Sequence, residues 1–153
     1  MTFIKDLLKD IGDEHATLAA DIKEDEKFVD TGSYIFNALV SGSINGGISA
    51  NKITAIAGES STGKTFFALS VVRSFLDNNP DAIVVYYDTE SAVTRSLLEE
   101  RNIDTSRVVV MNVVTIEEFR TKALQVIDKY QKTPEDERQP MMFVLDSLGM
   151  LST

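Results

Sequence analysis

The residues best suited to chemistry form one short run: Gly58, Glu59, Ser60, Ser61, Thr62, Gly63, Lys64 and Thr65. Two glycines with four residues between them, followed by lysine and threonine, are typical of a loop that binds the phosphates of a nucleoside triphosphate. The glycines let successive backbone N–H groups point at phosphate oxygens, and a following helix adds the positive end of its dipole. Lys64 can reach the β- and γ-phosphates, and the Thr65 hydroxyl can ligate Mg²⁺. This run predicts a nucleotide site.

Carboxylates follow two later apolar runs and extend this chemistry. Asp146 closes the run Met141–Leu145, where it can support Mg²⁺ directly or through bound water. Glu90 follows the run Ile83–Tyr87 and can orient or deprotonate an attacking water if that strand neighbours the one before the loop. Asp88 competes for the same task, and Glu90 could alternatively cap the next helix. We therefore predict hydrolysis as well as binding.

The surrounding pattern predicts the elements that position these residues. Apolar, β-branched runs predict strands, and helical patterns alternate with them. Since each run is almost entirely apolar, a parallel sheet with helices on both faces is expected. The predicted strands are 53–57, 83–87, 108–111 and 141–145. The predicted helices include an amphipathic one over 3–11, one after Ser33, one over 66–75, and one opened by a capping box of Thr115 and Glu118.

Composition excludes several classes of function. The 153 residues contain no cysteine and one histidine, which excludes disulfides, thiolate metal sites and histidine-rich metal sites. The net charge of −9 argues against this stretch being a general nucleic-acid-binding surface by itself. Residues 1–30 hold nine acidic residues against four lysines, a net charge of −5. No signal peptide or membrane-spanning run is visible, so a cytoplasmic location is expected.

Three motifs in this order resemble the ATPase core of RecA-type recombinases. The first runs from Thr31–Gly32–Ser33 through Gly46–Gly47 to the loop at 58–65. The others are Tyr87–Asp88–Thr89–Glu90 and Phe143–Val144–Leu145–Asp146–Ser147–Leu148. Within that family the chain resembles the UvsX-type strand-exchange recombinases of tailed phages, including their acidic amphipathic N-terminal segment. The resemblance covers nearly the whole chain.

This resemblance implies a RecA-like P-loop NTPase core that uses ATP and Mg²⁺. It implies a DNA-dependent ATPase that forms filaments on single-stranded DNA and promotes homologous pairing and strand exchange in recombination and repair. Residue by residue, Lys64 and Thr65 would hold phosphate and Mg²⁺, Asp146 would support Mg²⁺, and Glu90 would be the catalytic carboxylate, with Lys64 assisting. If the protein is phage-encoded, its place would be the host-cell cytoplasm.

The expected organisation is an N-terminal helical or oligomerisation segment over 1–30 and a partial ATPase core over 31–153. The family's DNA-binding loops would lie beyond Thr153, so the chain is expected to be an N-terminal fragment that does not exchange strands by itself. Single-stranded DNA and further copies of the chain are the expected partners, and no membrane is expected. Another P-loop enzyme, such as a small-molecule kinase, and a non-catalytic ATP-binding module are the alternatives.

Overall fold

The computed structural model describes residues 2–12, 16–21 and 27–152. Residues 13–15 and 22–26 of the predicted N-terminal segment therefore lie outside the described residues. The centre of the fold is a parallel sheet of β3 (Ile83–Asp88), β4 (Val108–Asn112) and β5 (Met141–Asp146), in the order β4-β3-β5. Asp88 lies opposite Asn112 on one side and Asp146 on the other, so the three strands end at the same edge.

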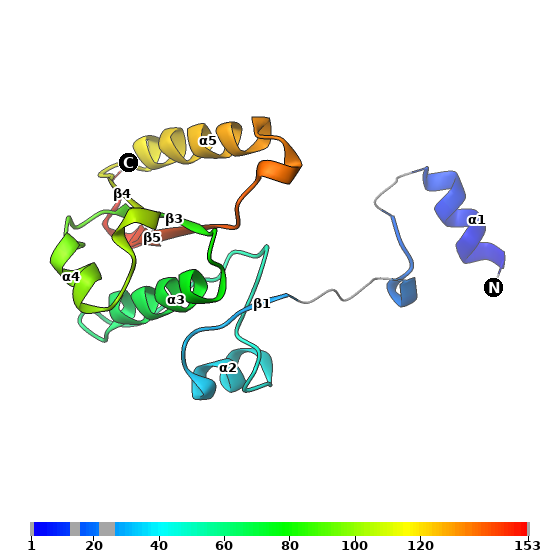
Figure 1. Ribbon diagram of the computed structural model, residues 1–153. Coiled ribbons are helices and arrows are strands. Elements are labelled where there is room, and N and C mark those ends of the chain that lie inside the picture. Colours follow the sequence, from blue (N-terminus) through cyan, green and yellow to red (C-terminus); the bar gives the residue numbers. More distant parts are fainter. Residues whose placement is uncertain (1, 13–15, 22–26, 153) are drawn as a thin grey trace.

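Helices cover both faces of this sheet, as the sequence predicts (Figure 1). On one face, α3 (Lys64–Asn78) and α4 (Arg95–Glu100) pack against Val84 and Tyr86 of β3. On the opposite face lies α5 (Ile116–Lys132), which packs on Val85 and Tyr87. Side chains of successive strand residues point to opposite faces, so both faces need cover when the whole strand is apolar. The α/β class is confirmed.

Only the central strand is buried along nearly its whole length. Five of the six residues of β3 are buried, whereas every residue of β4 and β5 is half-buried or exposed, including Val109 and Phe143. Within the described residues, β4 and β5 each pair with β3 alone. A strand with one neighbouring strand leaves one edge open. The strands β4 and β5 are therefore less buried than β3, although their sequences are similarly apolar.

The predicted strand over 53–57 is wrong. The structure has no regular element there, and every residue from Asn51 to Thr62 is exposed. Ile53 is fully exposed, at 102% of its reference area. A strand needs a neighbour to pair its backbone N–H and C=O groups, and no described strand pairs with this segment. Its apolar composition was therefore a poor guide to its conformation.

The helices α2 (Tyr34–Ser41) and α5 start at the side-chain caps that the sequence predicts. Ser33 Oγ accepts the backbone N–H of Phe36 over 3.4 Å and opens α2 (Tyr34–Ser41). Thr115 Oγ1 accepts the N–H of Glu118 over 3.1 Å and opens α5. The Glu118 carboxylate returns to the N–H of Val114 over 3.1 Å, one residue before the cap. These bonds satisfy N–H groups that a helix leaves unpaired at its start.

The segment before the loop forms a small unit. A two-residue antiparallel ladder joins β1 (Phe28–Val29) to β2 (Ile48–Ser49). Gly47 makes this possible, because a Cβ there would lie 2.0 Å from the Val29 carbonyl oxygen. Short 3₁₀ turns complete the chain at Ala19–Asp21, Thr105–Arg107, Glu135–Glu137 and Leu148–Met150.

The predicted amphipathic helix is present as α1 (Thr2–Ile11), which lies apart from the sheet in Figure 1. Its apolar side chains Phe3, Ile4, Leu7 and Ile11 are exposed. Its predicted role as a contact between subunits stays a prediction. Over the described residues, no helix combines the length and apolar character that a membrane span requires.

Candidate functional site

The loop from Gly58 to Thr65 closes around the Lys64 ammonium. Lys64 Nζ donates to the carbonyl oxygens of Gly58 (3.0 Å) and Glu59 (2.7 Å). Thr62 Oγ1 also donates to the Glu59 carbonyl, over 2.8 Å. These bonds hold the lysine at the centre of the loop's curve, where its charge lies beside the start of α3. An anion binding here would meet both that charge and the helix N-terminus.

Glycine is required at the point where the loop becomes the helix. Gly63 has φ of +91° and precedes Lys64, the first residue of α3. This left-handed conformation is costly for residues with a Cβ. The other predicted loop residues Glu59, Ser60 and Ser61 are exposed, and no described hydrogen bond uses their side chains. They are therefore accessible to a ligand.

Thr65 and Asp146, predicted separately as Mg²⁺ residues, meet directly. Thr65 Oγ1 donates to Asp146 Oδ2 over 2.7 Å, although 81 residues separate them. Thr65 lies in the first turn of α3, and Asp146 is the last residue of β5. The contact arises because α3 packs on the face of the sheet to which Asp146 points. It joins the loop over 58–65 to the carboxyl end of the sheet.

Tyr86 is a third member of this cluster, and sequence reasoning missed it. Its side chain is fully buried, and its Oη donates to Asp146 Oδ2 over 2.8 Å. Burial, and next the hydrogen bond to Asp146, raise the pKa of the Tyr86 hydroxyl well above its ordinary value, so it stays protonated and donates. The only available signal was that a tyrosine in a buried strand usually needs a polar partner.

Glu90 reaches the same edge through the end of β5. Ser147 Oγ donates to Glu90 Oε1 over 3.4 Å. Thr89 joins the two strand ends, because its N–H donates to the Asp146 carbonyl (2.9 Å) and its Oγ1 accepts the N–H of Ser147 (2.9 Å). The condition set for Glu90, that its strand neighbours a strand before the loop, is not met. Instead β5 links Glu90 to Asp146.

Asp88 has a different position from the one that a catalytic carboxylate needs. It is 2% exposed, and its two oxygens accept the N–H groups of Glu90 (3.0 Å) and Val93 (2.8 Å). Both bonds fix the turn that carries Glu90. Asp88 therefore supports the turn that carries Glu90. This corrects the interpretation of Asp88 as an alternative catalytic carboxylate.

The donor set suits Mg²⁺ shared with a phosphate ligand. Within the described residues, no group of three or more His, Cys, Asp or Glu side chains could hold a metal alone. A hydroxyl and a carboxylate at 2.7 Å supply hard oxygen donors, and Mg²⁺ commonly takes few protein ligands and completes its shell with water and phosphate oxygens. Thr65 and Asp146 fit that pattern.

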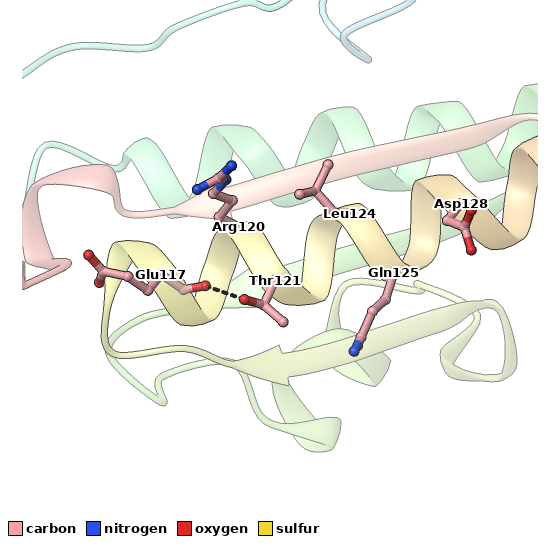
Figure 2. A pocket seen from close by; sticks show the side chains of 6 residues that line it. All are labelled: Glu117, Arg120, Thr121, Leu124, Gln125 and Asp128. Carbon is pink, nitrogen blue, oxygen red and sulfur yellow. Dashed lines mark hydrogen bonds between the residues drawn. The ribbon is translucent and has the colours of Figure 1, made fainter.

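A separate hollow runs along α5 (Figure 2). It is lined by Glu117, Arg120, Thr121, Leu124, Gln125 and Asp128. Thr121 Oγ1 donates to the Glu117 carbonyl over 2.7 Å, a bond within the helix. All six side chains come from one helix, and none belongs to the cluster around Asp146. We assign this hollow no chemistry.

Together, the fold and this cluster define an α/β protein with polar side chains gathered at the carboxyl end of a three-stranded parallel sheet. No protein-family model matches the chain. Over 119 residues it is 29% identical to the "Recombination and repair protein" of Enterobacteria phage T4. The match covers 78% of this chain and 29% of the phage T4 protein, so the chain spans under a third of that relative's length.

Proposed function

We propose that the chain is the ATP-binding part of a DNA-dependent ATPase that acts in recombination and repair. The observation that carries this proposal is the hydrogen bond between Thr65 and Asp146. It joins the first turn after a G-x-x-x-x-G-K-T loop to a carboxylate at the end of a parallel strand, which is the arrangement that P-loop enzymes use for Mg²⁺. The name of the phage T4 relative supports the role in recombination and repair.

Each residue then has a defined task. The backbone N–H groups of residues 58–65 and the Lys64 ammonium bind phosphate oxygens. Thr65 and Asp146 would hold Mg²⁺, which would neutralise phosphate charge when bound. Glu90 orients the attacking water and accepts its proton. Its carboxylate is exposed and tied to the end of β5 by Ser147, so it lies beside the edge where Asp146 stands.

The proposed dependence on DNA rests on the similarity to the phage T4 protein, and the surface of this chain does not add to it. The net charge of −9 makes the chain a poor binder of phosphate backbones as a whole. Filament formation and strand exchange are therefore proposed for a protein of the relative's length, of which this chain matches 29%. Self-association is proposed through α1, whose apolar side chains are exposed.

The test is binding of a fluorescent ATP analogue, mant-ATP, with and without Mg²⁺. Removal of the Lys64 ammonium in Lys64→Ala should weaken binding at least about tenfold, the equivalent of 1.4 kcal/mol. Lys52→Ala is the matched control, because Lys52 is an exposed lysine shortly before the loop. Absence of Mg²⁺-dependent binding by the wild-type chain, or equal binding by Lys64→Ala, would contradict the proposal.

A further inference from the structure

Two elements, α3 and β3, each place one donor at the same carboxylate oxygen of Asp146 in β5. Asp146 Oδ2 accepts from Thr65 Oγ1 of α3 at 2.7 Å and from Tyr86 Oη of β3 at 2.8 Å. No described residue donates to the other oxygen, Oδ1. Two O–H donors on the same oxygen fix the rotation of the carboxylate, because turning it would break both bonds. The remaining oxygen is then available to a ligand.

The two donors differ in what they can do besides donating. Thr65 is half-buried, and its oxygen keeps a lone pair that can bind a metal. Tyr86 is 0% exposed, so it can reach neither a nucleotide nor solvent. Its hydroxyl therefore acts on the site only through Asp146. A buried hydroxyl is costly without a partner, and here the partner is the carboxylate predicted to support Mg²⁺.

The neighbouring tyrosine provides an internal comparison. Tyr87 is also 0% exposed, but it points to the opposite face of the sheet. Its hydroxyl has no hydrogen-bond partner among the described residues, and its ring packs edge-on against Phe119 with 5.0 Å between centroids. Tyr86 and Tyr87 thus share a strand and a degree of burial, while only Tyr86 contacts the site.

We propose that Tyr86 is a positioning residue that holds the Asp146 carboxylate in the orientation required for Mg²⁺-dependent nucleotide binding. This inference rests on the proposed function of the site. Groups that orient a metal ligand without touching the metal commonly change metal affinity by about 10- to 100-fold when removed. Tyr86→Phe removes one oxygen atom and leaves the ring in the core, so it isolates the hydroxyl.

The experiment measures the Mg²⁺ concentration that gives half-maximal mant-ATP binding. Tyr86→Phe should raise that midpoint about tenfold, while Tyr87→Phe, the matched control, should leave it within about twofold of wild type. Thermal unfolding without Mg²⁺ or nucleotide is recorded for both variants. Tyr86→Phe is then repeated in an Asp146→Ala background, where the hydroxyl has lost its partner. There the midpoint should not shift further.

The outcomes separate this inference from the proposed function. A wild-type chain without Mg²⁺-dependent binding overturns the proposed function, and the inference falls with it. If the wild type binds but Tyr86→Phe behaves like Tyr87→Phe, only the inference is overturned. A variant that melts earlier with an unchanged Mg²⁺ midpoint would show a merely structural hydroxyl and would also overturn it. If the single variant Tyr86→Phe does not fold, the comparison is made in the Asp146→Ala background. A higher Mg²⁺ midpoint for the double variant than for Asp146→Ala then overturns the inference.

Discussion

The bond between Thr65 and Asp146 offers the sharpest test of the site. Thr65→Val removes the hydroxyl and keeps the branched shape, so the first turn of α3 should persist. Asp146 Oδ2 then keeps Tyr86 as its remaining donor. Thr65→Ser is the matched control, since it retains the hydroxyl. The two variants should differ in both stability and Mg²⁺ dependence.

The structure sets the size of the stability effect. A hydrogen bond to a charged group contributes about 1.5–3 kcal/mol. Thr65 and Asp146 are both half-buried, so water can replace part of the lost bond, and the lower value of about 1.5 kcal/mol applies. With a urea m value of about 2 kcal/mol/M, Thr65→Val should lower the unfolding midpoint by about 0.7 M.

Two assays check this prediction. Urea unfolding is followed by far-UV circular dichroism, because the chain has no tryptophan. Mant-ATP binding is then titrated with Mg²⁺, and loss of the threonine ligand should raise the required concentration about tenfold if the ligand contributes about 1.4 kcal/mol. Equal midpoints for Thr65→Val and Thr65→Ser in both assays would refute the reasoning.

Three further outcomes are expected. Glu90→Gln should leave mant-ATP binding nearly unchanged and, in a protein of the relative's length, slow ATP hydrolysis stimulated by single-stranded DNA by about 100-fold or more. An unchanged phosphate-release rate would remove Glu90 from catalysis. Asn37→Ala should lower the free energy of unfolding by about 3 kcal/mol, because the buried amide makes four hydrogen bonds within residues 30–44. Urea titration measures this change, and Asn45→Ala, at an exposed asparagine, is the control that should change it little. The amide of Asn37, and next the backbone N–H of Gly32, hold the pKa of Asp30 below its ordinary value. That stabilisation is present above about pH 4 and fades on acidification, so the difference in urea midpoint between wild type and Asp30→Asn should shrink as the pH falls, and a constant difference would contradict it.

Local features were predictable from sequence because their causes lie within a few residues. The caps at Ser33 and Thr115 act three residues along the chain. The amphipathic helix α1 and the three strands of the parallel sheet follow from the spacing of apolar residues. The positive φ at Gly63 agrees with the glycine that the loop pattern requires. For the caps, α1 and Gly63, the neighbours along the chain suffice to set the conformation.

The segment over 53–57 shows where that reasoning stops. Its composition resembles that of Ile83–Asp88, yet one is an exposed irregular segment and the other a buried central strand. Composition reports what a segment could bury, but pairing depends on a neighbouring strand. Only β3, with partners on both sides, is buried through most of its length. No local pattern distinguishes these two cases.

The loop from Gly58 to Thr65 and the carboxylates at the strand ends were predictable from the amino-acid sequence alone. The tertiary structure decided which of those carboxylates meets which group: Asp146 meets Thr65, while Asp88 turns inward to hold the backbone of Glu90. It also recruited Tyr86, a residue without any motif. The reason is physical, because contacts across 60 and 81 residues depend on the order of strands in the sheet and on the face where α3 packs.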